Sequence, residues 1–84
     1  GRMIDFIEFD DDFAIAKIHA PVSSHNRTLA DLGIREEFGV TVVGLKRTKQ
    51  DFQHAIPGTL VLSGDLLIVS GPTHLIQKFA GHSI

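Results

Sequence analysis

One arginine stands where its side chain could bind an anion. Arg35 lies between Gly33 and Gly39, and each glycine is placed to close a short helical turn. A guanidinium held between two such turns can face a cleft and bind a phosphate through two parallel hydrogen bonds. The alternative is an ion pair with a carboxylate close by in the sequence. The candidate carboxylates are those of Asp31, Glu36 and Glu37. The sequence leaves both alternatives open.

The other polar residues predict neither a catalytic site nor a metal site. The five histidines show no His-x-His or His-x-x-x-His spacing and no clustered carboxylate partner, so we expect scattered surface histidines. The run Asp10-Asp11-Asp12 lacks the spacing of a calcium loop, which favours a solvated acidic loop. The chain has no cysteine and no Gly-x-Ser-x-Gly elbow. We therefore expect a protein that is not an enzyme.

Composition restricts the classes of protein further. A chain of 84 residues forms one domain, and it buries only roughly 60–65% of the surface exposed when unfolded, which leaves a thin margin of stability. With 43% apolar residues, it has enough hydrophobic surface to present an apolar face to a partner. Eight basic and ten acidic residues form no basic stripe, which argues against nucleic-acid binding. The longest apolar run, Leu66–Val69, is too short for membrane insertion.

The residue pattern predicts a small set of strands and helical turns. The expected strands are Phe13–His19, Val40–Leu45, a weaker Phe52–Ile56 and Leu66–Ser70. Val40–Leu45 is apolar on both sides, which predicts that both of its faces are covered. Thr28 is expected to cap a short helix that Gly33 ends, and Gly39 is expected to end the next turn. A final helix is expected to begin near Pro72.

Three connections complete the predicted framework. The basic run Lys46-Arg47-Thr48-Lys49 is interpreted as part of a solvated hairpin tip over residues 46–51. Asp65, in the turn Ser63-Gly64-Asp65, is expected to accept local amide hydrogen bonds. Met3–Phe9 has an ambiguous period and is interpreted as a connector or an edge segment that packs elsewhere. The predicted fold is α+β, with a small mixed or antiparallel sheet of about four strands.

Two motifs give this chain a resemblance to a known family. Residues 29–40 follow the pattern Leu-x-x-Leu-x-Ile-Arg-x-x-(aromatic)-Gly-Val, and residues 64–71 follow Gly-Asp-x-Leu-x-Val-x-Gly. With Pro57 and the apolar residues of 75–79, they resemble the RCK C-terminal (TrkA-C) domain over residues 11–84. The resemblance implies that residues 1–10 are a linker from a preceding nucleotide-binding domain. It also implies a two-fold homodimer within a cytosolic ring that gates a potassium channel or transporter.

The resemblance also implies a ligand and the residues that would bind it. Several members bind cyclic di-AMP between two C-terminal domains. Carried over to this sequence, Leu29, Val42 and Pro57 would supply an apolar patch for the adenines, and Arg35 would contact the polar part. Thr41 stands where the ligand-binding members carry asparagine, and it offers one hydroxyl in place of an amide group. Ala55 stands where a proline is expected.

The resemblance places the expected partners outside this domain. No cofactor is expected here, because NAD or ATP would belong to the preceding domain. The expected partners are a second copy, the membrane subunit of a potassium channel or transporter and a small nucleotide. The expected location is the cytoplasm, peripheral to the inner membrane through that membrane subunit. Two alternatives stay open: an assembly module of the gating ring that binds no ligand, and a regulatory tail of a cation–proton antiporter.

Overall fold

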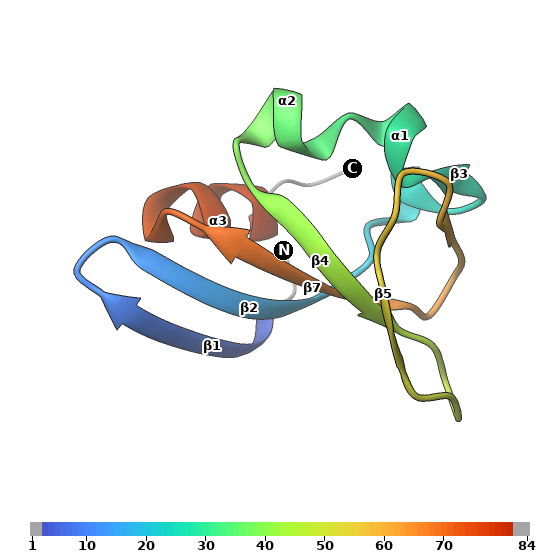
Figure 1. Cartoon of the computed structure of the whole chain (residues 1–84), viewed down its shortest axis with the longest axis horizontal. Helices are drawn as coiled ribbons and strands as arrows, with labels where there is room; N and C mark the ends of the chain where they lie inside the picture. The colour runs from blue at the N-terminus through green and yellow to red at the C-terminus, as the bar shows by residue number, and fades with distance from the viewer. Residues whose placement is uncertain (1–2, 82–84) are drawn as a thin grey trace.

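The computed structural model describes residues 3–81, whose main element is a five-stranded antiparallel sheet with helices packed against it (Figure 1). The strand order is β1-β2-β7-β4-β5. The bounds are Met3–Asp10 for β1, Phe13–His19 for β2, Thr41–Lys46 for β4, Phe52–His54 for β5 and Leu66–Gly71 for β7. A second antiparallel pair joins β3 (Arg27–Thr28) to β6 (Leu60–Val61). The helices are the 3₁₀ helix η1 (Val22–Ser24), α1 (Leu29–Leu32), α2 (Ile34–Phe38) and α3 (Thr73–Ala80).

The predicted α+β class with an antiparallel sheet is confirmed, and the sheet has one strand more than predicted. The additional strand is β1, which is an edge strand of this same sheet rather than a segment that packs elsewhere. It pairs with β2 so that Phe6 lies opposite Ala16 and Ile7 opposite Ile15. The return strand β5 ends at His54, two residues earlier than predicted.

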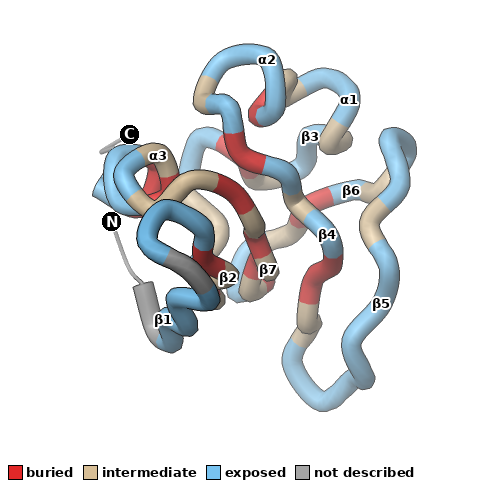
Figure 2. The backbone as a smooth tube through the Cα atoms, turned by 60° about the vertical axis from the view of Figure 1, so that its left-hand side comes forward, coloured by how far each residue is buried: buried red, intermediate tan, exposed pale blue. Residues whose placement is uncertain are grey.

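Alternating strand residues supply the core beneath α3 (Figure 2). The buried apolar residues of these strands are Ala14, Ala16 and Ile18 in β2 and Leu67 and Val69 in β7, and Leu45 of β4 and Val61 of β6 belong to the same cluster. Helix α3 adds the buried residues Ile76 and Phe79 to the same cluster. The Phe79 ring meets Phe38 of α2 edge-on, with 5.0 Å between the ring centroids. Packing of the sheet, α2 and α3 into one cluster thus fixes where α2 sits relative to β4.

Strand β4 departs from its predicted pattern at a β-bulge. Val42 pairs with Val69, but Gly44 rather than Val43 pairs with Ile68, so Val43 is an extra residue in the strand. Such a bulge changes which side of the strand faces the core. The Val43 side chain is consequently 42% exposed. The prediction that both faces of this strand are covered is wrong.

The predicted helix ends are confirmed around α1 and α2. The Thr28 hydroxyl accepts a hydrogen bond from the Asp31 amide at 3.1 Å and so caps α1. Gly33 and Gly39 end α1 and α2 with φ angles of 58° and 75°, in the left-handed region that glycine adopts without steric cost. The two short helices are therefore held at a fixed angle above the start of β4.

Replacing Gly39 by alanine is expected to lower the free energy of unfolding by about 1–2 kcal/mol. An alanine there would keep φ near 75°, and its Cβ would lie 2.9 Å from Cδ1 of Leu75. Gly58→Ala is the matched control, because no atom of residues 3–81 beyond its chain neighbours lies within 4 Å of an added Cβ. We expect the control to change stability by less than about 0.5 kcal/mol. Urea unfolding of both variants measures the difference, and equal effects would contradict the backbone argument.

Candidate functional site

A groove with a volume of about 580 Å³ lies between the helices α1 and α2 on one side and residues 55–57 on the other. All five residues predicted to bind a ligand line it. They are Leu29, Arg35, Thr41, Val42 and Pro57. The other lining residues are Ala30, Ile34, Glu36, Ala55 and Ile56. The groove therefore combines apolar walls with one cation, one carboxylate and one hydroxyl.

Backbone hydrogen bonds bring the two sides of the groove together. The Leu29 amide donates to the Thr59 carbonyl at 3.0 Å, and the Ala30 amide donates to the Pro57 carbonyl at 2.9 Å. These amides belong to the first turn of α1, where amides have no partner within the helix. Residues that are 27 and 30 positions apart in the sequence thus become neighbours, and an apolar surface forms from both segments.

The Arg35 guanidinium is exposed beside this apolar surface. The alternative that it pairs with a nearby carboxylate is wrong, because within residues 3–81 its side chain makes no hydrogen bond or ion pair. Asp31 is instead engaged by Arg27, whose Nε lies 2.8 Å from the Asp31 Oδ2. The Arg35 charge is therefore free to meet an anion in the groove.

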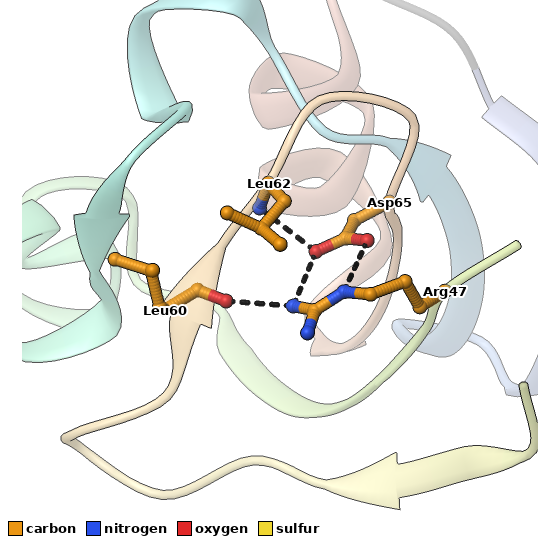
Figure 3. Close-up of polar contacts among 4 residues, drawn as sticks. All are labelled: Arg47, Leu60, Leu62 and Asp65. Atoms are coloured by element: carbon orange, nitrogen blue, oxygen red, sulfur yellow. Dashed lines mark hydrogen bonds and ion pairs between the residues drawn. The ribbon is translucent and has the colours of Figure 1, made fainter.

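A second arginine, Arg47, forms an ion pair that the sequence interpretation missed (Figure 3). Its Nε and Nη2 donate to the Oδ1 and Oδ2 of Asp65, both at 2.9 Å. Nη2 also donates to the carbonyl of Leu60 at 2.8 Å. Arg47 was assigned to a solvated hairpin tip, but its side chain is only 26% exposed and that of Asp65 is fully buried.

The predicted local role of Asp65 is confirmed, since its Oδ2 accepts the Leu62 amide at 2.9 Å. Burial by itself would raise the pKa of the Asp65 carboxyl. The hydrogen bonds from Arg47 and Leu62, together with the positive charge of Arg47, outweigh burial and hold this pKa below its ordinary value. The side-chain hydrogen bonding with Asp65 also raises the pKa of Arg47 above its ordinary value, and burial opposes this increase. Both groups are therefore charged at neutral pH.

Two of the four histidines within residues 3–81 make side-chain contacts, and these contacts lie on different histidines rather than in a cluster. His25 Nε2 lies 3.2 Å from the Ala20 carbonyl, and His74 Nδ1 lies 3.4 Å from Oδ1 of Asp12. No group of three His, Cys, Asp or Glu side chains in residues 3–81 is arranged to hold a metal ion. Over the same residues, no helix has the length and hydrophobicity needed to cross a membrane.

Comparison with known proteins finds a family model and two curated relatives. The model of the TrkA-C domain matches residues 13–81. Ktr system potassium uptake protein C of Bacillus subtilis (strain 168) is 29% identical over 79 residues, which cover 94% of this chain and 36% of that protein. Ktr system potassium uptake protein A of the same strain is 20% identical over 78 residues, 93% of this chain and 35% of that protein. The chain thus spans little more than a third of either relative.

Two solved structures share the fold. The RCK C domain of the potassium transport protein KtrA, in complex with cyclic di-AMP, has a TM-score of 0.71 and 27% identity. That match covers 79% of this chain and 78% of the KtrA domain chain. The GsuK RCK domain has a TM-score of 0.75 and 18% identity, over 100% of this chain and 19% of that one. The second likeness concerns the fold alone.

Proposed function

This chain belongs to the TrkA-C domain family, and on that premise we propose that it is a regulatory domain whose groove binds cyclic di-AMP. The observation that carries the proposal is a groove that brings apolar residues from three separate segments next to Arg35, whose side chain makes no hydrogen bond or ion pair within residues 3–81. Leu29, Val42 and Pro57 offer an apolar surface to the adenine bases, and Arg35 offers two parallel donors to a phosphate. The KtrA domain that shares this fold is itself in complex with cyclic di-AMP.

The proposed mechanism is that a ligand selects one geometry of a two-fold homodimer. Two apolar residues of the segment that borders the groove remain exposed on this chain. Ile56, which lines the groove, is 62% exposed, and Leu60 is 44% exposed. A second copy that covers them would enclose a ligand lying against Arg35. Since a ligand shifts an equilibrium only through its differential affinity for the two states, the groove must fit the ligand better in one dimer geometry.

The proposed partner of the dimer is the membrane subunit of a potassium channel or transporter. The two curated relatives are potassium uptake proteins of Ktr systems. We infer a cytoplasmic position, peripheral to the membrane through that subunit. A nucleotide-binding domain that binds NAD or ATP is proposed to precede residues 1–10, which would then act as the linker. The second candidate function, an assembly module without a small ligand, is favoured by Thr41, which offers fewer hydrogen bonds than asparagine would.

Calorimetry with sedimentation separates the two candidates. We expect cyclic di-AMP added to the chain to release or absorb heat that saturates at one ligand per two chains, while AMP at the same concentration gives no comparable saturation. Sedimentation velocity at high micromolar concentration is expected to show a dimer. A dimer that gives no heat at saturating cyclic di-AMP would favour the assembly module, and a monomer would contradict both candidates.

A further inference from the structure

We propose that Arg47 and Asp65 are positioning residues for the groove, which act on it through the segment that forms its outer wall. Neither residue lines the groove. The wall segment, residues 55–60, connects β5 to β6 and contains three of the residues that line the groove. The inference concerns the wall itself, and only its consequence for cyclic di-AMP rests on the proposed function.

The wall segment is attached to the rest of the protein near its two ends. At its start, the Ala55 amide donates to the Val43 carbonyl at 3.2 Å. At its end, the Leu60 carbonyl accepts the Arg47 guanidinium at 2.8 Å (Figure 3). Between them the chain makes a turn, in which the Ile56 amide donates to the Thr59 hydroxyl at 3.0 Å. The turn fixes the local shape of the segment. The two attachments help to fix where it lies, together with the pairing of Leu60 with Thr28 and the α1 amides that donate to the Pro57 and Thr59 carbonyls.

Hydrophobic packing cannot replace these attachments. Ile56, Pro57, Gly58 and Leu60 are all exposed, and no residue of the wall segment is buried. A segment held mainly by exposed hydrogen bonds opens at low free-energy cost. The Leu60 contact is charge-assisted, and such a bond is roughly twice as strong as a neutral one. Arg47 therefore adds a charge-assisted contact to the backbone hydrogen bonds that hold the wall in place.

Asp65 fixes Arg47 to the core of the protein. The Asp65 side chain is fully buried, and its backbone carbonyl accepts the Ala20 amide at 2.9 Å. Its carboxylate binds the Leu62 amide as well as both donors of Arg47. Asp65, the residue directly before β7, thus holds the guanidinium on one side. On the other side the guanidinium donates to the Leu60 carbonyl of the wall. Its planar fork makes these contacts together, which a lysine ammonium cannot do.

The opposite side of the groove also depends on the wall. The amides of Leu29 and Ala30 in α1 donate to the carbonyls of Thr59 and Pro57. If the wall moves, these amides lose their acceptors and α1 loses an attachment. Arg47 consequently influences both sides of the groove from outside it. This is the behaviour expected of a residue that supports a binding site without touching its ligand.

Hydrogen exchange tests the inference without any ligand. In Arg47→Lys, we expect the Leu29 and Ala30 amides to exchange about tenfold faster or more, relative to the amides of the central strand β7. The control is Ile18→Ala, which removes buried atoms on β2, a strand not represented in the groove lining. Ile18→Ala should accelerate amide exchange by making global unfolding more frequent, so the α1 amides should not exchange faster relative to those of β7. Asp65→Asn serves as a second variant if the lysine variant does not fold. Equal acceleration in α1 and β7 would overturn the inference.

Cyclic di-AMP affinity, measured well below the unfolding temperature, tests the consequence for binding. We expect the dissociation constant of Arg47→Lys to rise about tenfold, by analogy with the loss of affinity when the hydrogen-bond partners of metal ligands are replaced. The Ile18→Ala control should bind as the unmodified chain does. If the unmodified chain binds and Arg47→Lys binds equally well, the positioning role is wrong. If the unmodified chain does not bind, the proposed ligand is wrong, and hydrogen exchange alone decides the role of Arg47.

Discussion

Replacing Arg35 by alanine is expected to raise the dissociation constant for cyclic di-AMP by about 10- to 100-fold, the loss that follows when a charge-assisted hydrogen bond is removed. The variant should remain folded, because the side chain is exposed and makes no ion pair or hydrogen bond within residues 3–81. We expect its free energy of unfolding to stay within about 0.5 kcal/mol of the original value. Calorimetric titration and urea unfolding of the same sample measure the two quantities.

Two controls show whether the effect belongs to the groove. Arg27→Ala removes an exposed arginine that pairs with Asp31 and does not line the groove. The affinity of this variant for cyclic di-AMP should be unchanged. Arg35→Lys keeps the charge and loses the planar fork, so we expect an intermediate affinity. Unchanged affinity in Arg35→Ala, or an equal loss in Arg27→Ala, would remove Arg35 from the proposed site.

Replacing Arg47 by methionine is expected to lower the free energy of unfolding at pH 7 by about 2–3 kcal/mol. Methionine fills similar space, but the fully buried carboxylate of Asp65 would then lack its cation, and the Leu60 carbonyl would lose its donor. This loss of stability is small for a broken buried ion pair, because the Arg47 side chain is 26% exposed. Asp65→Asn combined with Arg47→Met should cost less than the sum of the two single changes, since the double variant leaves no charge unpaired.

The effect of Arg47→Met should depend on pH in a defined direction. The pKa of Asp65 is lowered in the folded chain, so its contribution to stability is complete above the unfolded value of about 3.9 and is lost as pH falls through the lower folded value. In Arg47→Met we expect burial, no longer offset by the cation, to raise the pKa of the Asp65 carboxyl, so that its protonation relieves the cost. The stability difference between the two proteins should therefore be largest at neutral pH. It should shrink as pH falls through the raised pKa of the variant, and shrink further as pH falls through the lowered pKa of the unmodified chain. Urea unfolding at pH 7 and pH 3 that gives equal differences would contradict this account.

Local features of this fold could be predicted from the sequence because local chemistry decides them. The Thr28 hydroxyl caps α1 from three residues away, and Gly33 and Gly39 end their helices through their own backbone angles. The local hydrogen bond of Asp65 has the same origin. The residues of the groove follow from the family resemblance. The Leu29 and Pro57 segments are joined by hydrogen bonds across 27 and 30 positions, which no local pattern encodes.

The missed features depend on contacts between distant segments. Arg47 pairs with Asp65 across 18 residues, and a basic run read by itself favours a solvated tip. The bulge at Val43 arises from the register between β4 and β7, while the residue pattern of β4 alone predicts regular alternation. The two-residue strands β3 and β6 are too short to show a period. Arg27 engages Asp31, which removes one of the three candidate carboxylates of Arg35, and spacing cannot resolve this competition between two arginines.

Titration of the isotope-labelled chain with cyclic di-AMP, followed by NMR, tests the central claim most directly. We expect saturable shifts of the amide signals of Leu29, Arg35 and Val42, which line three parts of the groove. The same signals should respond weakly in Arg35→Ala at equal ligand concentration. Shifts confined to β1 and α3, or no shifts at saturating cyclic di-AMP, would contradict the assignment of this groove as the ligand site.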